Sequence, residues 1–178
     1  TEGCCAKAAA GLTSLELLGV TALPAETRIE GVPLGGLSGL TFDAASGRFL
    51  ALSDDRSENG PARFYELAIA LGEGGGRHPE ALEVRVERAT TLLTATGAPF
   101  ARRSLDPEGI ALGRDRIYIS SEGEAGVGQA PFVAELDLAG RFVRELPLPE
   151  RYRPVKGAAV GVRENMGFES LALSPDGR

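Results

Sequence analysis

Short apolar runs separated by turn residues organise this chain from residue 37 onward. The first run, Leu37–Phe42, is followed by a turn cluster over 43–47 and by a second run, Phe49–Leu52. Two short strands on either side of a tight reversal are typical of a β-hairpin. Farther along, residues 82–87 alternate strictly between apolar and charged side chains, as a half-buried outer strand does. The pattern predicts antiparallel β-structure.

The same pattern returns about 70 residues later. Glu108-Gly109-Ile110-Ala111 matches Ser38-Gly39-Leu40-Thr41, residues 116–122 match 48–54 with a shorter turn, and 131–138 match 62–69. A third copy opens at Glu169-Ser170-Leu171-Ala172. A recurring period of this kind usually marks units that cannot bury their own faces alone.

Each repeat accommodates four strands, so we predict an all-β fold: a β-propeller of four-stranded antiparallel blades. Strands are expected at about 37–43, 48–53, 62–70 and 82–93, and again at about 108–112, 116–121, 131–138 and 141–147. Blade 1 then covers about 37–93, blade 2 about 108–147, and blade 3 begins at about 168–178. Propellers close with typically 4–8 blades. We therefore expect about two and a half blades of a longer propeller, without a closed ring.

The N-terminal region differs from these repeats. Residues 1–12 are small and alanine-rich and predict a flexible tail, after which residues 13–178 form the N-terminal portion of the propeller domain. Leu15–Val20 and Thr27–Val32 predict two further strands. Because the first blade already has its four strands, we expect an N-terminal strand to complete the last blade of a closed ring.

Composition narrows the function classes. The formal net charge of −6 argues against a nucleic-acid binder, which needs a basic surface, and the acidic excess instead favours metal cations. The 24 glycines suit a fold rich in turns. No apolar run approaches the ~18 residues of a membrane span, so no transmembrane segment is expected in this chain.

Cys4 and Cys5 are the only cysteines and are adjacent. They are too few for a disulfide scaffold and lack the spacing of a zinc site. Gly3-Cys4 is similar to the end of a bacterial lipoprotein signal, but the apolar stretch that precedes such a cysteine is missing. A lipidated Cys4 and an ordinary pair of tail cysteines both remain open.

Antiparallel order predicts which loops share a face. The loops after the second and fourth strands of each blade return to the same side, whereas His78 falls on the opposite side. This places one group of polar residues together: Asp54, Asp55, Arg56, Glu58, Asn59, Asp106, Glu108, Glu122, Glu124, Arg163, Asn165 and Glu169.

These residue types favour hydrolysis of a small-molecule ester or phosphoester by a metal-activated water. Clustered carboxylates offer the oxygens that Ca²⁺ or another divalent cation requires, and we assign Asp54, Asp55, Glu58 and Glu122 to the metal. Glu108, Asp106 and Glu169 are the candidate catalytic residues, and Arg56, Asn59, Arg103, Arg163 and Asn165 the candidate substrate-binding residues. Further cations on the same connections, Arg102, Arg151, Arg153 and Lys156, suit an anionic group. The competing interpretation is that these charges form salt bridges between blades and cap turns.

A serine nucleophile is disfavoured. Ser38 misses the GxSxG pattern because its second glycine, Gly39, comes one residue early. The single histidine falls on the wrong face for a Ser/His pair. The glycines beside Ser38 are better explained by close approach of strands at the centre of a ring.

Four motifs in fixed order, GGLSGLTFD, DPEGIAL, IYISSEG and GFESLALSPDGR, resemble the phytase-like bacterial β-propellers described by an "esterase-like activity of phytase". The resemblance covers about residues 30–178. It implies a hydrolase that is secreted, periplasmic or lipid-anchored. The calcium-dependent propeller phytases are more distant, since their Asp-Asp-Pro-Ala motif and its following tryptophan are absent. Their calcium and phosphate ligands are therefore not carried over to this chain.

Two other functions stay open. The alternative to hydrolysis is a non-catalytic propeller module whose face binds a glycan, a peptide or a protein partner. Alternatively, an incomplete set of blades does nothing by itself, because it exposes unpaired strand edges.

Overall fold

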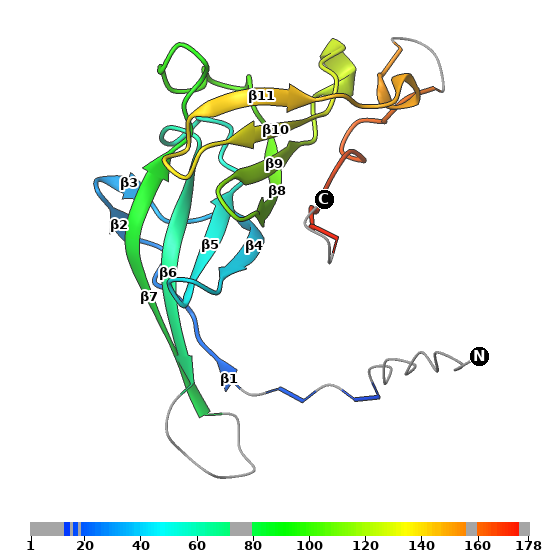
Figure 1. Ribbon diagram of the computed structural model, residues 1–178. Helices are drawn as coiled ribbons and strands as arrows, with labels where there is room; N and C mark the ends of the chain where they lie inside the picture. The colour runs from blue at the N-terminus through cyan, green and yellow to red at the C-terminus, as the bar shows by residue number, and fades with distance from the viewer. Residues whose placement is uncertain (1–12, 15, 18, 72–79, 156–159, 175–178) are drawn as a thin grey trace, which may run out of the picture.

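The computed structural model describes residues 13–14, 16–17, 19–71, 80–155 and 160–174. The described chain is built from sheets that are antiparallel except for one short parallel pair, and its helical content is limited to two short 3-10 turns, η1 (Ala125–Val127) and η2 (Glu150–Tyr152). Figure 1 shows the two main sheets and the C-terminal segment, drawn in orange and red, beside the second of them. The all-β prediction is confirmed. The described residues form no closed propeller ring.

The first sheet contains the four strands of the first repeat. These are β4 (Leu37–Asp43), β5 (Arg48–Ser53), β6 (Arg63–Leu71) and β7 (Glu80–Thr91), paired antiparallel in chain order. The bounds of β4 and β5 are those predicted, whereas β7 begins and ends two residues earlier than predicted.

The second sheet contains the four strands of the second repeat, again antiparallel in chain order. They are β8 (Pro107–Leu112), β9 (Ile117–Ser121), β10 (Phe132–Leu136) and β11 (Phe142–Leu146). Each lies within about two residues of its predicted bounds at either end. Each of the two repeats therefore forms one set of four antiparallel strands, and the first set is extended to a five-stranded sheet by β1 (Gly19–Val20).

The N-terminal region corrects two expectations. Thr27–Val32 is not one strand but the hairpin of β2 (Arg28–Ile29) and β3 (Val32–Pro33). Its two loop residues, Glu30 and Gly31, have φ angles of 52° and 85°, the left-handed values that a tight hairpin loop requires.

Within the predicted strand Leu15–Val20, of which residues 16–17 and 19–20 are described, Gly19–Val20 form β1, which pairs parallel with the start of β7. This contradicts the expectation that an N-terminal strand has no partner in the first repeat. The reason is the position of β7, which is the outermost strand of the first repeat and pairs with β6 on one side only, so that its other edge accepts β1.

The third repeat is described as far as residue 174, and residues 168–174 form no strand. The predictions for Pro175–Arg178, the glycine-rich loop with His78, Lys156 and the two cysteines fall outside the described residues.

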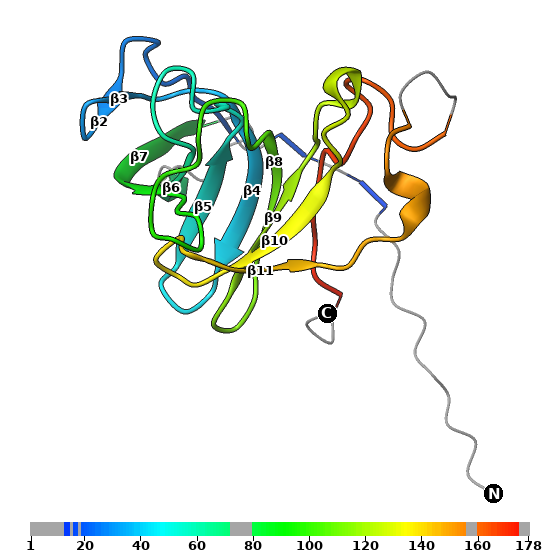
Figure 2. The same ribbon diagram turned by 90° about the horizontal axis from the view of Figure 1, so that it is seen from above.

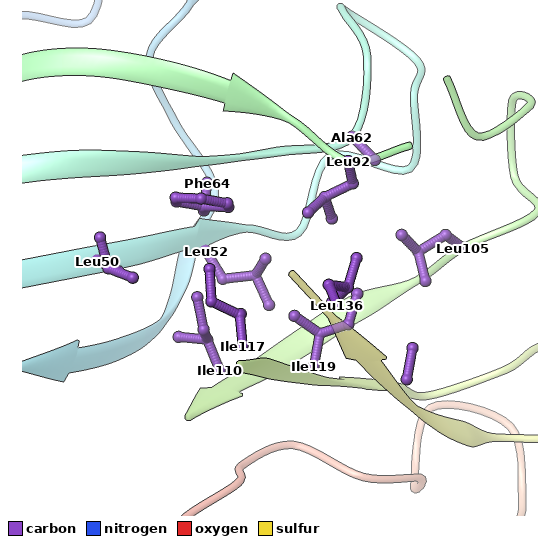
Figure 3. Packing of buried hydrophobic residues seen from close by; sticks show 11 residues of the cluster. Leu50, Leu52, Ala62, Phe64, Leu92, Leu105, Ile110, Ile117, Ile119 and Leu136 are labelled. Atoms are coloured by element: carbon purple, nitrogen blue, oxygen red, sulfur yellow. The ribbon is translucent and has the colours of Figure 1, made fainter. Parts of the chain in front are cut away.

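A single apolar cluster joins the two sheets. Leu52 and Phe64 of the first sheet face Ile110 and Ile119 of the second, and Leu136 completes the contact, as Figure 3 shows. These side chains are almost fully buried. Each contributes roughly 1.5–3 kcal/mol of transfer free energy to folding. The cluster fixes the two repeats relative to each other.

The sheets approach most closely at strands β4 and β8, which run side by side in Figure 2. A Cβ atom on Gly39 would lie 2.9 Å from the carbonyl oxygen of Glu108. In the next repeat, a Cβ on Gly109 would lie 2.6 Å from the backbone nitrogen of Leu171. Equivalent glycines therefore let each repeat contact the backbone of the following one, which is the close approach expected from the sequence.

Among the described residues, no helix has the length and apolar character needed to cross a membrane.

Candidate functional site: an acidic cluster where the repeats meet

The candidate site begins with a β-bulge at the same position in both repeats. Leu37 and Gly39 pair with consecutive residues of β5, which leaves Ser38 as the extra residue. Pro107 and Gly109 pair in the same way with β9 and leave Glu108 as the extra residue. Bulges redirect a side chain out of the ladder and are common beside active sites. The same kind of β-bulge therefore positions Ser38 in the first repeat and Glu108 in the second.

Three carboxylates meet at this end of the second sheet. Asp106, Glu108 and Glu122 each offer a carboxylate oxygen, and these oxygens lie within 4.8 Å of one another. Asp106 precedes β8, Glu108 is the bulged residue, and Glu122 follows β9. Asp106 and Glu122 are each only 7% exposed.

Buried serines hold the backbone of this cluster. The backbone N–H of Asp106 donates to Ser121 Oγ over 3.1 Å, and that of Gly109 donates to Ser120 Oγ over 2.9 Å. The N–H of Glu122 donates to the carbonyl of Asp106 over 2.9 Å, which ties the start of β8 to the end of β9. The positions of the carboxylates are therefore set by the sheet.

All three repeats contribute to the site. Ser38 of the first repeat donates its hydroxyl proton to Glu108 Oε2 over 2.6 Å. The backbone N–H of Gly167, at the start of the third, donates to Glu122 Oε1 over 2.9 Å. A Cβ on Gly167 would lie 2.4 Å from Glu122 Cγ, so this approach requires glycine. Each of these two glutamates has one oxygen positioned by a neighbouring repeat.

Two carboxyl groups of the cluster have raised pKa values. Burial raises the pKa of Glu108 to about 7; the hydrogen bond from Ser38 opposes this rise, and the charges of Asp106, Glu169 and Asp54 add to it. Burial also raises the pKa of Asp106, against the opposing effect of Arg56 and with a further contribution from Glu122, Asp54 and Glu124. Asp54 and Glu169, both predicted site residues, thus lie close enough to act on the cluster.

Arginines beside the cluster are already paired with carboxylates. Arg56 Nε lies 3.5 Å from Asp106 Oδ2, and its Nη2 donates to Glu124 Oε2 over 2.5 Å. Arg103 donates to Glu124 Oε1 over 2.6 Å and lies 3.5 Å from Glu58 Oε1. The Arg103 hydrogen bond is the main reason that the pKa of Glu124 is lowered. Arg56 and Arg103 therefore link loops rather than offering free cations to a substrate.

Glu58 belongs to the same salt-bridge network. Its Oε1 accepts from Arg102 over 3.1 Å, in addition to its contact with Arg103. The structure places Glu58 with these arginines and not among the three clustered carboxylates.

Asp55 has a structural role. Its Oδ2 lies 3.0 Å from Arg63 Nη1 in an ion pair that is almost completely buried, and its Oδ1 accepts from the backbone N–H groups of Glu58 and Asn59. Burial by itself raises the pKa of Asp55, but the hydrogen bonds from Glu58, Arg63 and Asn59 outweigh it and lower the pKa overall. Arg63 in turn donates to Tyr65 and to the carbonyl of Pro33.

Three predicted binding residues lie outside the acidic cluster. Asn59 lines a polar cavity of about 380 Å³ together with Asp54 and Gly36. Arg163 lines another cavity, with Arg151. Asn165, at a φ angle of 53°, lies in the turn in which the N–H of Met166 donates to the carbonyl of Arg163. Within the described residues, no hydrogen bond or ion pair joins Arg163 or Asn165 to the clustered carboxylates.

Sequence reasoning missed Ser38 and Gly167 as parts of the site. The signal for Ser38 was present, because it is the repeat equivalent of Glu108. Gly167 likewise occupies the third-repeat position equivalent to Asp106, two residues before Glu169.

Comparison with curated proteins and with solved structures finds no match. A family model does match: the model "Phytase-like: Esterase-like activity of phytase" covers residues 32–178, which is most of the chain and includes strands β4 to β11 and every residue of the acidic cluster. This agrees with the resemblance carried by the sequence motifs. The chain therefore belongs to the phytase-like family described by the esterase-like activity of phytase.

Proposed function

We propose that this protein is a hydrolase of β-propeller architecture that cleaves an ester or phosphoester at the acidic cluster with the help of a divalent cation. The observation that carries the proposal is the convergence of Asp106, Glu108 and Glu122, whose carboxylate oxygens lie within 4.8 Å of one another. Membership of the phytase-like family supports the hydrolytic class.

The propeller architecture is supported by the way the repeats contact one another. Gly39 contacts the second repeat and Gly109 the third, through the same strand of the unit each time. The same relation applied repeatedly to four-stranded sheets generates a ring of blades with the first strand of each blade innermost. Ser38, Glu108 and Glu169 would then lie in sequence around the central opening.

The carboxylates fit a hard cation such as Ca²⁺. Two oxygens bound to Ca²⁺ at 2.3–2.6 Å can be separated by at most about 5 Å, and the cluster offers one oxygen from each of three carboxylates toward the six to eight that Ca²⁺ requires. When bound, such a cation lowers the pKa of a coordinated water and polarises the ester oxygen. This assignment moves Asp106 and Glu108 from the catalytic role expected from the sequence to the metal.

The surrounding residues orient the ligands. Ser38 holds Glu108 Oε2 and Gly167 holds Glu122 Oε1, which leaves the second oxygen of each glutamate for the cation. Arg56 Nε contacts Asp106 Oδ2 over 3.5 Å as an ion pair without a hydrogen bond. Metal ligands are commonly oriented by such outer hydrogen bonds.

The test is hydrolysis of p-nitrophenyl phosphate and p-nitrophenyl acetate, with Ca²⁺ added or chelated. We expect Glu108→Gln and Glu122→Gln to weaken Ca²⁺ binding in calorimetry by tenfold or more and to reduce turnover in parallel. Glu145→Gln, which neutralises an exposed carboxylate on β11, is the matched control. Turnover that is indifferent to chelator and to both site substitutions would exclude the metal mechanism.

A non-catalytic binding function is the second candidate, and the polar cavity beside the cluster favours it. Asp54 and Asn59 line this cavity together with the backbone of Gly35 and Gly36. Carboxylate, amide and backbone groups suit a hydroxyl-rich ligand such as a glycan. This function predicts a ligand-dependent rise in melting temperature, no turnover of either ester, and tolerance of Glu108→Gln.

A further inference from the structure

We propose that Arg151 and Arg163 form a binding site for an oxyanion such as a phosphoryl group, separate from the acidic cluster. The two arginines line a cavity of about 390 Å³ with Tyr152, Gly161, Val162 and Met166. Binding of an anion here requires neither a metal ion nor the hydrolytic activity proposed above.

Charge pairing distinguishes these arginines from those near the cluster. Arg56, Arg63, Arg102 and Arg103 each lie within 4.0 Å of a carboxylate oxygen. In the described part of the chain, neither Arg151 nor Arg163 makes an ion pair with an aspartate or a glutamate. An unpaired guanidinium keeps its full charge and most of its donors available to an incoming anion.

The walls of the cavity are held together by backbone contacts. The N–H of Val162 donates to the carbonyl of Tyr152 over 3.2 Å, which joins the two stretches that carry the arginines. Gly161 adopts a φ angle of 81°, and a Cβ there would lie 2.0 Å from the carbonyl oxygen of Arg153. Only glycine permits this crossing, so the spacing of Arg151 and Arg163 is built into the chain.

Aromatic side chains position Arg151. Its guanidinium carbon lies 5.0 Å from the ring centroid of Tyr152, and this ring packs edge-on against Phe168 with centroids 5.2 Å apart. A guanidinium stacked on an aromatic face loses less conformational freedom when it binds an anion. Phe168 follows Gly167, whose N–H contacts Glu122, so the arginine cavity and the acidic cluster are linked by one short segment.

The experiment is a calorimetric titration of the full chain with inorganic phosphate in the presence of chelator. We expect saturable binding by the unchanged protein, and a loss of about tenfold or more in affinity for Arg151→Gln and for Arg163→Gln, since each removes a charge-assisted contact. Arg114→Gln, which removes an arginine from the turn between β8 and β9, should leave the affinity unchanged.

Gly161→Ala provides a second variant that keeps both charges but separates the walls of the cavity, and it should also lose affinity for phosphate.

p-Nitrophenyl phosphate distinguishes the two sources of the anion. Tighter binding than inorganic phosphate indicates the phosphoryl group of a larger molecule, and equal binding indicates free phosphate. Absence of saturable phosphate binding, or equal affinity of the two arginine variants and Arg114→Gln, would overturn the proposal. Glu108→Gln should retain phosphate binding, so failure of the metal mechanism and failure of this site are separately observable.

Discussion

At the scale of single residues, Ser38 shows how a neighbouring repeat controls the chemistry of the site. Its hydroxyl donates to Glu108 and opposes the rise that burial imposes on the pKa of that glutamate. Removing the donor in Ser38→Ala withdraws an interaction that favours the ionised form, so the pKa of Glu108 should rise further above about 7. A ¹³C NMR titration of the glutamate carboxyls, compared with Ser46→Ala in the β4–β5 turn, measures this change. A lower or unchanged pKa in Ser38→Ala would show that the hydrogen bond does not control the titration.

Asp55 gives a pH-dependent prediction at the same scale. Its folded-state pKa is lowered, so its contribution to stability is present above the ordinary aspartate pKa, near 4, and is lost as the pH falls through the lower folded value. Asp55→Asn leaves the buried Arg63 without its charge partner and should cost about 3 kcal/mol at pH 7.

Urea unfolding between about pH 7 and pH 3 provides the measurement. The difference in unfolding free energy between the unchanged protein and Asp55→Asn should shrink as Asp55 becomes protonated. Asp115→Asn, at an exposed ion pair in the β8–β9 turn, is the control and should cost at most about 1 kcal/mol. If the difference in unfolding free energy between the unchanged protein and Asp55→Asn were constant with pH, the stabilising role of the ionised Asp55 carboxylate would be contradicted.

At the scale of elements, the apolar runs and their repeat were sufficient to predict most strands. The bounds of β4 and β5 follow directly from alternating turns and apolar runs, because these signals are local. The hairpin of β2 and β3 was missed because its loop carries Glu30 at a positive φ, a residue without the turn preference of Gly or Asn. The partner of β1 was missed because pairing with β7 depends on tertiary placement.

Strand packing between repeats is tested by one glycine. Gly39→Ala places a methyl group against the carbonyl of Glu108 and the N–H of Ile110, which are backbone atoms and cannot move independently. We expect a destabilisation of about 1–3 kcal/mol and a displaced Glu108. Gly35→Ala, whose Cβ would meet no atom within 4 Å, is the matched control and should be nearly neutral. Equal unfolding free energies for the two variants would refute the close approach of β4 and β8.

At the scale of the whole molecule, the shared face of the site could be anticipated but its charge pairing could not. Antiparallel topology correctly suggested that Asp106, Glu108 and Glu122 come together. Topology alone did not show that Asp55 forms an ion pair with Arg63, or that Glu58 forms ion pairs with Arg102 and Arg103. It therefore could not distinguish these two carboxylates from those that are free to bind a cation. Such pairing is decided by side-chain geometry over a few ångströms, whereas periodicity in the sequence fixes only the face and the end of each strand.

The outer face of the first sheet carries exposed apolar side chains. Leu37, Leu40 and Phe42 on β4 are about half exposed, and the first two line an apolar cavity of about 460 Å³ with Ile69 and Val84. Contiguous apolar surface of this kind promotes association. We expect the 178-residue chain to self-associate as its concentration rises, and Leu40→Lys to shift the equilibrium toward monomer in light scattering coupled to size exclusion. Val127→Lys changes an equally hydrophobic, more exposed residue on η1 outside this face and should leave association unchanged. A monomer at every concentration, or equal responses to the two substitutions, would show that this sheet face is not the associating surface.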